Sequence, residues 1–355
     1  MSKPTIEQLM QLCIEDGASD IHISVGSKPI IRKNTHLVTV DTDVLDQSDT
    51  EGFMKAITPE RIQTEYMETG SGDFSLRYSD QARFRVALFK EKGNCTLVLR
   101  RIPTKILKLS DIGLPDAILE ICGRARGLFL VTGPTGSGKT TTLASIIDHI
   151  NCTSDKHILT FEDPIEYFHE HKMSLVHQRE IGVDVPDFPE ALRRGLRQDP
   201  DVILVGEMRD LETIRAAVTA AETGHLVFAT LHTSGAASTV NRVIDAFPAD
   251  EQEHIRVQLA GSLVAVLSQV LCSRANGNGM VAAYEFLHVT SSVQNMIRNN
   301  KPFSIDSDIQ TGSKFGMQLL DDHLFKLVQG GHIEPTTAVE KSRNPREMIE
   351  RLGLS

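Results

Sequence analysis

The sequence contains no tryptophan, and aromatic residues make up only 5% of its 355 residues. Proteins that bind single-stranded nucleic acid stack bases on aromatic side chains, so this scarcity argues against such a role. Basic residues are also in deficit, because 37 Lys and Arg face 47 Asp and Glu and the formal net charge is −10. Since a net basic face is the usual footprint of nucleic-acid binding, we expect no nucleic-acid partner.

Cysteine is scarce, and long apolar runs are missing. The chain has 5 cysteines and no C-x-x-C pair, which argues against a zinc ribbon and a disulfide framework. We expect reduced, buried thiols at Cys13, Cys95, Cys122, Cys152 and Cys272. The longest apolar stretch, Leu259–Cys272, contains small and polar residues and is too short to span a bilayer. These features are typical of a soluble protein made for the cytoplasm.

The chain has two regions of different pattern, and its 355 residues suit two domains. Two prolines and a glycine mark residues 103–115 as a linker between a domain at 1–102 and a domain at 116–355. The first region predicts a helix over roughly residues 5–16, then short alternating strands that indicate an α+β domain with a mainly antiparallel sheet. These strands are expected at Ile21–Ile23, Pro29–Ile31, Phe74–Leu76, Phe84–Val86 and Leu97–Leu99.

The second region alternates apolar runs with helical stretches, which is typical of an α/β domain with a mostly parallel sheet. Asp210 is placed to cap a helix over Leu211–Glu222, and residues 250–253 have the spacing of a capping box. Four runs are nearly all apolar and predict strands that are buried on both faces. They are Leu128–Val131, Ile158–Phe161, Val202–Val205 and Leu226–Leu231.

A phosphate-binding loop follows the first of these strands. Residues 133–140, GPTGSGKT, match the pattern G-x-x-x-x-G-K-[ST] in full, between a predicted strand and a predicted helix. Its glycines let backbone N–H groups surround phosphate oxygens, and the helix N-terminus adds a favourable dipole. Lys139 would reach the β- and γ-phosphates of ATP, and the Thr140 hydroxyl would bind Mg²⁺. The predicted nucleotide-binding residues are Gly133, Pro134, Thr135, Gly136, Ser137, Gly138, Lys139, Thr140 and Thr141.

Polar residues follow the other three predicted strands. Glu162 and Glu207 each come just after a strand, and the carboxyl ends of neighbouring parallel strands meet where ligands bind. The strand before Glu207 resembles a Walker B strand, with Gly206 where an aspartate often stands, so we assign Glu207 to polarising the attacking water. Glu162 is assigned to a second water or to the metal shell, which makes Thr140, Glu162 and Glu207 the candidate Mg²⁺ ligands. His232 is either a sensor of the γ-phosphate or a hydrogen-bonded structural residue.

The ordered motifs resemble those of a known family. The segments GPTGSGKTTT, TFEDPIEY, DPDVILVGEMRD and GHLVFATLHT are similar to the Walker A, Asp-box, Walker B and His-box motifs of the secretion-type hexameric ATPases. Residues 17–22 (GASDIH) and 240–269 (VNRVIDAFPADEQEHIRVQLAGSLVAVLSQ) narrow the resemblance to the pilus-retraction, or twitching-motility, ATPases. The resemblance covers most of the chain. It implies a PAS-like N-terminal domain joined to a RecA-like ATPase domain, with six copies in a ring at the base of a type IV pilus.

The resemblance also bears on the branch of the family and on a catalytic arginine. Pilus-assembly and secretion relatives usually carry a tetracysteine insertion that this chain lacks, which favours the retraction branch. Retraction ATPases typically show the segment AIRNLIRE, whereas residues 292–299 read SVQNMIRN here.

The resemblance implies that an arginine of the first domain reaches the nucleotide. The candidates are Arg83, Arg85, Arg100 and Arg101, with Arg193, Arg194 and Arg197 as alternatives. The predicted catalytic set is Glu207, Lys139, Glu162, His232 and Arg85.

Together these features predict a Mg²⁺-dependent ATPase that works as a homohexameric ring and powers pilus retraction. We expect it in the cytoplasm, peripheral to the inner face of the membrane through an inner-membrane pilus platform protein. Three other functions remain open: an accessory or specialised motor for secretion or DNA uptake, a non-hydrolysing ATP-binding regulator, and a RecA-like nucleic-acid translocase. The presence of Glu207 disfavours the regulator, and the net charge of −10 disfavours the translocase.

Overall fold

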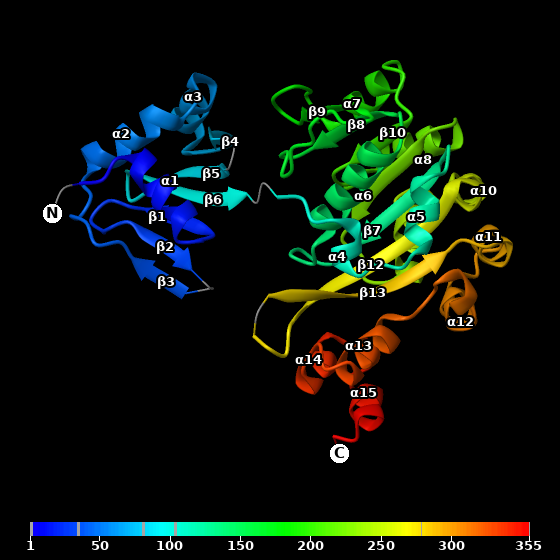
Figure 1. The fold of residues 1–355 in the computed structure, drawn as a ribbon. Helices are drawn as coiled ribbons and strands as arrows, with labels where there is room; N and C mark the ends of the chain where they lie inside the picture. Colours follow the sequence, from blue (N-terminus) through cyan, green and yellow to red (C-terminus); the bar gives the residue numbers. More distant parts are fainter. Residues whose placement is uncertain (1–2, 34–35, 80–81, 103–104, 278, 355) are drawn as a thin grey trace. The chain divides into compact units, whose positions relative to one another are not determined.

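The chain forms two compact units (Figure 1). One unit contains the residues up to Lys105 together with Glu166–Phe168, and the other contains Ile106–Ile165 and the residues from His169 onward. The structure is a computed structural model, and it describes residues 3–33, 36–79, 82–102, 105–277 and 279–354.

The first unit is built on a six-stranded antiparallel sheet with the order β3-β2-β1-β6-β5-β4. This is the α+β architecture that the sequence predicts, with every predicted strand present. The patterns did not predict β3, α2 or α3. The strands are β1 (Asp20–Ile23), β2 (Ile30–Lys33), β3 (His36–Thr39), β4 (Ser71–Ser79), β5 (Ala82–Glu91) and β6 (Asn94–Ile102), and the helices are α1 (Ile6–Glu15), α2 (Gln47–Ile57) and α3 (Glu60–Thr69).

Local sequence explains the elements of this unit. Helix α1 begins at a capping box in which the Thr5 hydroxyl accepts from the Gln8 N–H and the Gln8 side chain accepts from the Thr5 N–H. Strand β5 alternates, so Phe84 and Val86 are buried while Arg85 is exposed on the opposite face. A period of 3.6 residues for apolar positions indicates a helix such as α1, and a period of 2 residues indicates a strand such as β5.

The second unit contains a seven-stranded sheet with the order β13-β12-β7-β11-β10-β8-β9. All neighbouring pairs are parallel except β12 and β13. The four predicted strands lie at its centre and are buried on both faces, as their apolar runs indicate. The stretch Leu259–Cys272 forms the last residues of a helix and nearly all of strand β12. The patterns did not predict this strand. The strands are β7 (Gly127–Thr132), β8 (His157–Glu162), β9 (Leu175–Glu180), β10 (Val202–Val205), β11 (Leu226–Leu231), β12 (Leu263–Ser273) and β13 (Met280–His288).

Helices pack against both faces of this sheet (Figure 1). On one face, α5 (Ala117–Cys122) and α6 (Lys139–Thr153) pack against Phe129 and Val131. Six helices line the core on the other face. They are α7 (Phe188–Gly195), α8 (Leu211–Glu222), α9 (Ala236–Asp245), α10 (Gln252–Ser262), α11 (Ser291–Arg298) and α12 (Ile305–Thr311).

The two predicted helix starts have different outcomes. Asp210 caps α8 as expected, because its carboxylate accepts from the backbone N–H of Thr213 at 2.8 Å. The capping box at residues 250–253 is wrong, since α10 begins with Glu251 in the N-cap position. The Glu251 carboxylate instead pairs with the Arg215 guanidinium of α8 at 2.7 Å, a tertiary contact that sequence spacing does not reveal.

The C-terminal segment adds a small helical cluster next to β12 and β13. Its core includes Cys272 and Leu324. Arg343 connects the segment to the sheet, because its Nη2 lies 2.7 Å from an oxygen of the fully buried Glu285 carboxylate. The short elements here and in the linker region are α4 (Leu109–Ile112), η1 (Pro302–Ser304), η2 (Ser313–Phe315), α13 (Leu320–Gln329), α14 (Pro335–Lys341) and α15 (Pro345–Leu352). Pro103 and Thr104 of the expected linker lie outside the described residues.

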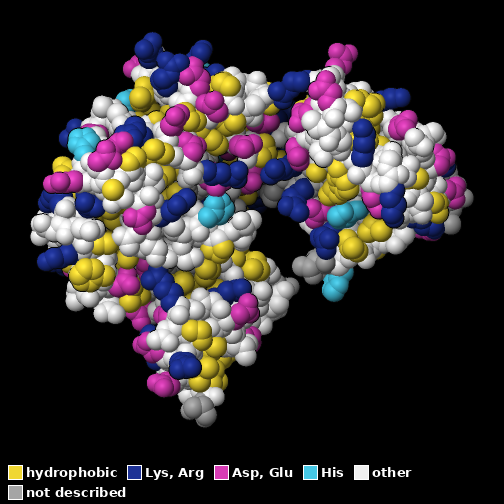
Figure 2. All heavy atoms as spheres, turned by 180° about the vertical axis from the view of Figure 1, so that it is seen from behind, with side chains coloured by type: hydrophobic (Ala, Val, Ile, Leu, Met, Phe, Trp, Pro, Cys, Tyr) yellow, Lys and Arg dark blue, Asp and Glu magenta, His cyan; other side chains and the backbone are white. Residues whose placement is uncertain are grey.

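The cysteines, the apolarity of the helices and the charged surface relate to the location in the cell that the sequence predicts. All five cysteines are free, but Cys152 is exposed, so the prediction of burial is wrong at that position. Its thiol lies on the last turn of α6, facing Lys172 and Asp148 at the surface. Among the described residues, no helix is long and apolar enough to cross a membrane. Figure 2 shows basic and acidic side chains intermingled on the visible face.

Candidate nucleotide-binding site

The phosphate-binding loop connects the buried strand β7 to helix α6, which begins at Lys139. Gly133, Gly136 and Gly138 all have positive φ, at 142°, 79° and 89°. A Cβ atom on Gly133 would lie 2.3 Å from the Gln269 carbonyl oxygen and 2.7 Å from Ser137 Oγ, so only glycine fits there. The motif therefore supplies the backbone shape that an anion-binding loop at a helix N-terminus needs.

The side chains of the loop are arranged for contact with an anion. Pro134 and Thr135 are exposed, and Thr140 is half-buried in the first turn of α6. Lys139 Nζ donates to the carbonyl oxygens of Gly133, at 2.8 Å, and Pro134, at 3.1 Å. These contacts place the positive charge within the loop.

The ends of β8, β10 and β11 bring three predicted site residues to one edge of the sheet. Strand β10 lies between β8 and β11, so Glu162 at the end of β8 is next to Glu207 and His232, which follow β10 and β11. On its other side β11 pairs with β7, which leads into the phosphate-binding loop. The carboxyl-terminal edge of this sheet therefore carries both the loop and the carboxylates.

Glu207 is held by two basic side chains. One carboxylate oxygen lies 2.8 Å from His232 Nε2 and the other lies 2.8 Å from Arg209 Nη2. Burial alone would raise the pKa of Glu207, but the hydrogen bonds and charges of Arg209 and His232 outweigh it, so the pKa lies below its ordinary value. A carboxylate that stays ionised can accept a hydrogen bond from water and orient it. Arg209 is a partner that the motifs did not point out.

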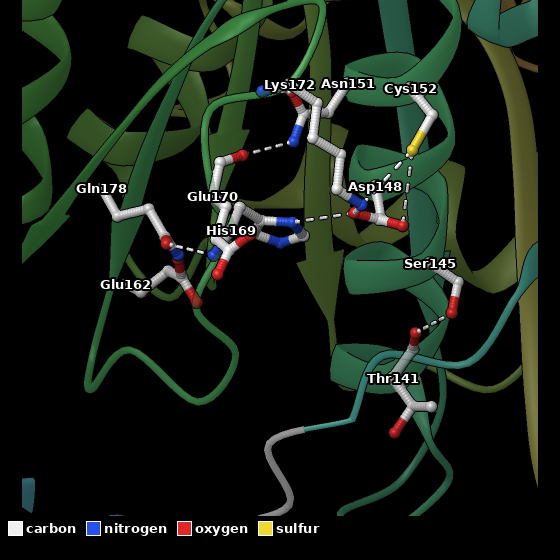
Figure 3. A network of polar contacts seen from close by, with 10 residues as sticks. All are labelled: Thr141, Ser145, Asp148, Asn151, Cys152, Glu162, His169, Glu170, Lys172 and Gln178. Carbon is white, nitrogen blue, oxygen red and sulfur yellow. Dashed lines mark hydrogen bonds and ion pairs between the residues drawn. The ribbon is translucent and has the colours of Figure 1, made fainter. Parts of the chain in front are cut away.

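Glu162 is buried and held by a different network, of which Figure 3 draws the part around Gln178 and His169. Its Oε1 accepts from Thr160 Oγ1 at 2.7 Å and from Gln178 Nε2 at 3.0 Å. The side-chain amide oxygen of Gln178, Oε1, in turn accepts from the backbone N–H of His169 at 2.8 Å. Gln178 lies on β9, a strand that the apolar pattern did not predict, so sequence analysis missed this partner of Glu162.

The same network reaches the helix that follows the phosphate-binding loop (Figure 3). Asn151 of α6 donates from Nδ2 to the Glu170 carbonyl at 2.7 Å and accepts at Oδ1 from the Lys172 N–H at 3.2 Å. His169 precedes Glu170 in the chain, and burial lowers the pKa of its side chain to about 4. The segment between β8 and β9 is thus fixed to α6 on one side and to Glu162, through Gln178, on the other.

The candidate arginines occupy separate surroundings. Arg85 belongs to the first unit, where it is exposed on β5, and its catalytic role stays a prediction. Arg100 donates to Asp20 at 2.8 Å within that unit. In the second unit, Arg193 and Arg194 both pair with Glu190 on the same helix. Which of the candidate arginines acts on the nucleotide stays a prediction.

The comparisons with known proteins agree on one family. The family model "Type II/IV secretion system protein" matches residues 2–314. The chain is 46% identical to "Type IV pilus retractation ATPase PilT" of Pseudomonas aeruginosa, over 96% of this chain and 98% of the relative. It is 45% identical to "Twitching motility protein" of Neisseria gonorrhoeae, over 90% and 86%. A crystal structure of the pilus retraction motor PilT with bound ADP has a TM-score of 0.90 and 44% identity, over 97% of this chain and 99% of the other.

Proposed function

The chain belongs to the type II/IV secretion system protein family, and we propose that it is an ATPase that drives type IV pilus retraction as a ring of six subunits. The observation that carries this proposal is the similarity to a pilus retraction motor over 97% of the chain at a TM-score of 0.90. The phosphate-binding loop and the ionised Glu207 at the same edge of the sheet supply the chemistry.

The proposed reaction is attack of water on the γ-phosphate of ATP. Glu207 orients and polarises the water, and its low pKa keeps the carboxylate ionised. Lys139 and the N–H groups at the start of α6 balance the charge that develops on the phosphate oxygens. His232 contacts Glu207 and could report the state of the phosphate through that carboxylate. An arginine such as Arg85 is expected to add a further positive charge.

The residues present suit Mg²⁺ as a cofactor. This ion keeps several waters and needs only one or two protein ligands beside substrate phosphates. The half-buried hydroxyl of Thr140 would be one ligand, and Glu162 or Glu207 would act directly or through water. When bound, the ion would neutralise charge on the β- and γ-phosphates.

Assembly and location follow from the same proposal. We expect a homohexamer in the cytoplasm, attached to the membrane only through a platform protein of the pilus and without a nucleic-acid partner. The domain boundaries at 1–102, 103–115 and 116–355 are part of this proposal. Closure of the two domains around ATP would be the working stroke, with the linker as hinge.

An accessory or specialised motor is the second candidate, and helix α11 is the observation that favours it. Its buried residues Val293 and Ile297 hold the helix in place. The departures from the retraction pattern, Ser292, Gln294 and Asn299, are exposed or half-buried. The changes therefore affect a surface that a partner could contact, and leave the fold and the ATPase site intact.

Pilus retraction in cells that lack their own retraction ATPase tests the proposal. We expect the wild-type chain to restore retraction and Lys139→Ala to fail at equal expression. A well-expressed, ATP-hydrolysing chain that restores nothing would favour the accessory motor or a mismatched partner. Ser292→Ala, Gln294→Arg and Asn299→Glu, combined, would then separate these two explanations. Absence of ATP turnover in the purified wild type would contradict the motor itself.

A further inference from the structure

Strand β12 presents two neighbouring polar side chains to opposite faces of the sheet. Leu267 belongs to the core under α6, whereas Val266 belongs to the core on the other face. Since side chains alternate along a strand, Gln269 points to the α6 face and Ser268 to the opposite face. Gln269 is 1% exposed, and Ser268 is 6% exposed. A buried amide at this position needs polar partners, because burying one without hydrogen bonds is costly.

Gln269 finds both partners in the phosphate-binding loop and the helix that follows it. Its Nε2 donates to the carbonyl oxygen of Ser137 at 2.7 Å, and its Oε1 accepts from Thr142 Oγ1 at 3.0 Å. Its backbone carbonyl oxygen would lie only 2.3 Å from a Cβ atom on Gly133. Gln269 thus lies against the start of the loop at Gly133, bonds to Ser137 near its end and bonds to Thr142 in the first turn of α6.

The bond to Ser137 fixes the direction of a peptide group. In a trans peptide, the carbonyl of one residue and the N–H of the next point in opposite directions. Because the Ser137 carbonyl points toward the Gln269 amide, the Gly138 N–H points away from that amide. Backbone N–H groups of such a loop line the concavity that binds phosphate.

We propose that Gln269 is a positioning residue that holds the phosphate-binding loop in its anion-binding shape, and so sets the affinity for the diphosphate part of a nucleotide. This inference rests on the proposed nucleotide site. The loop would contact the same phosphates in the bound substrate and in the transition state. Loss of Gln269 should therefore weaken binding uniformly, which raises KM and leaves kcat nearly unchanged.

The test compares ADP binding and ATP turnover of Gln269→Met and Ser268→Ala. Methionine keeps the size of the side chain and removes both hydrogen bonds. Ser268→Ala is a matched control, because Ser268 accepts from the Gly235 N–H at 2.8 Å on the opposite face. We expect Gln269→Met to raise the Kd for MgADP and the KM for ATP by roughly tenfold, with kcat within about threefold. Ser268→Ala should change Kd by less than about twofold.

Thr142 provides a second variant if Gln269→Met does not fold. Thr142→Val removes the hydroxyl that donates to the side-chain amide oxygen of Gln269, so the Kd for MgADP should rise by about threefold. Thr142→Ser keeps the hydroxyl and should have the wild-type Kd. The inference is overturned if a folded Gln269→Met or Thr142→Val binds MgADP like the wild type, or if Ser268→Ala weakens binding equally. Failure of the wild type to bind MgADP would instead contradict the proposed nucleotide site.

Discussion

The phosphate-binding loop and the carboxylate side of the site lie at the same edge of one sheet but are built differently. The loop depends on backbone shape, with Gly133 and Gly138 at positive φ. The carboxylate side depends on side-chain pairs: Glu207 with Arg209 and His232, and Glu162 with Gln178. A backbone shape depends on consecutive residues, whereas the pairs of Glu207 with His232 and of Glu162 with Gln178 join residues that follow or lie on different strands.

The difference implies two kinds of failure. A change in the loop should affect how nucleotide binds, because the loop contacts phosphate in every bound state. A change on the carboxylate side should affect how fast bound ATP reacts, because a polarised water matters only during the chemical step. Two experiments test this division, and a third tests the stability of the segment beside Glu162.

The largest effect is expected from Lys139→Ala and Glu207→Gln. Each should lower ATP turnover by about 10² or more, since both remove transition-state stabilisation. Lys139→Ala should also weaken MgADP binding by at least roughly tenfold, whereas Glu207→Gln should leave it within about threefold. Steady-state kinetics and calorimetry measure the two quantities. Glu212→Gln, at an exposed position on α8, is the control and should resemble the wild type. Near-normal turnover in Glu207→Gln would rule out its assigned role.

An intermediate effect is expected from Gln178→Met. Without the amide that donates to Glu162, the carboxylate is less well placed, and kcat should fall by about tenfold with little change in KM. Gln258→Met is a matched control, because Gln258 also donates to a glutamate, Glu222, at 2.8 Å, on the helix surface. A rise in KM at constant kcat would contradict the division, since it would place Gln178 with the loop.

The smallest effect is a loss of stability in acid. Burial lowers the pKa of both His169 and His323 to about 4, below an unfolded value of about 6.5. Between these values the unfolded chain binds protons that the folded chain excludes, so stability falls as the pH drops. At pH 5 each histidine should cost about 2 kcal/mol relative to pH 8.

Urea unfolding at pH 8 and pH 5 measures this loss. His169→Leu should remove about 2 kcal/mol of the difference between the two pH values. His254→Leu, at an exposed position on α10, should leave the difference unchanged. If His169→Leu also leaves it unchanged, the segment beside Glu162 does not depend on a neutral histidine.

The sequence predicts the parts of the fold that repeat a local pattern. The four apolar runs are found as the central parallel strands, and Asp210 caps α8, because burial and capping act within a few residues. Strands β9, β12 and β13 were missed. Strands β9 and β13 lie at the two edges of the sheet, and β12 contains Ser268 and Gln269 in its interior. The capping box at residues 250–253 failed because α10 begins one residue later than that spacing requires, with Glu251 as the N-cap and no side-chain cap hydrogen bond.

The shape of the phosphate-binding loop and the family could be recognised from the sequence, because both depend on ordered runs of neighbouring residues. The side chains that hold Glu207, Glu162 and the loop were identified from the folded structure. The motifs single out none of Arg209, Gln178 and Gln269 as a partner. Gln178 and Gln269 act through contacts of 3.0 and 2.7 Å to groups on other elements, and Arg209 through its pair with Glu207 at 2.8 Å. Such contacts arise only when separate strands are packed side by side, where a buried polar group must find a partner.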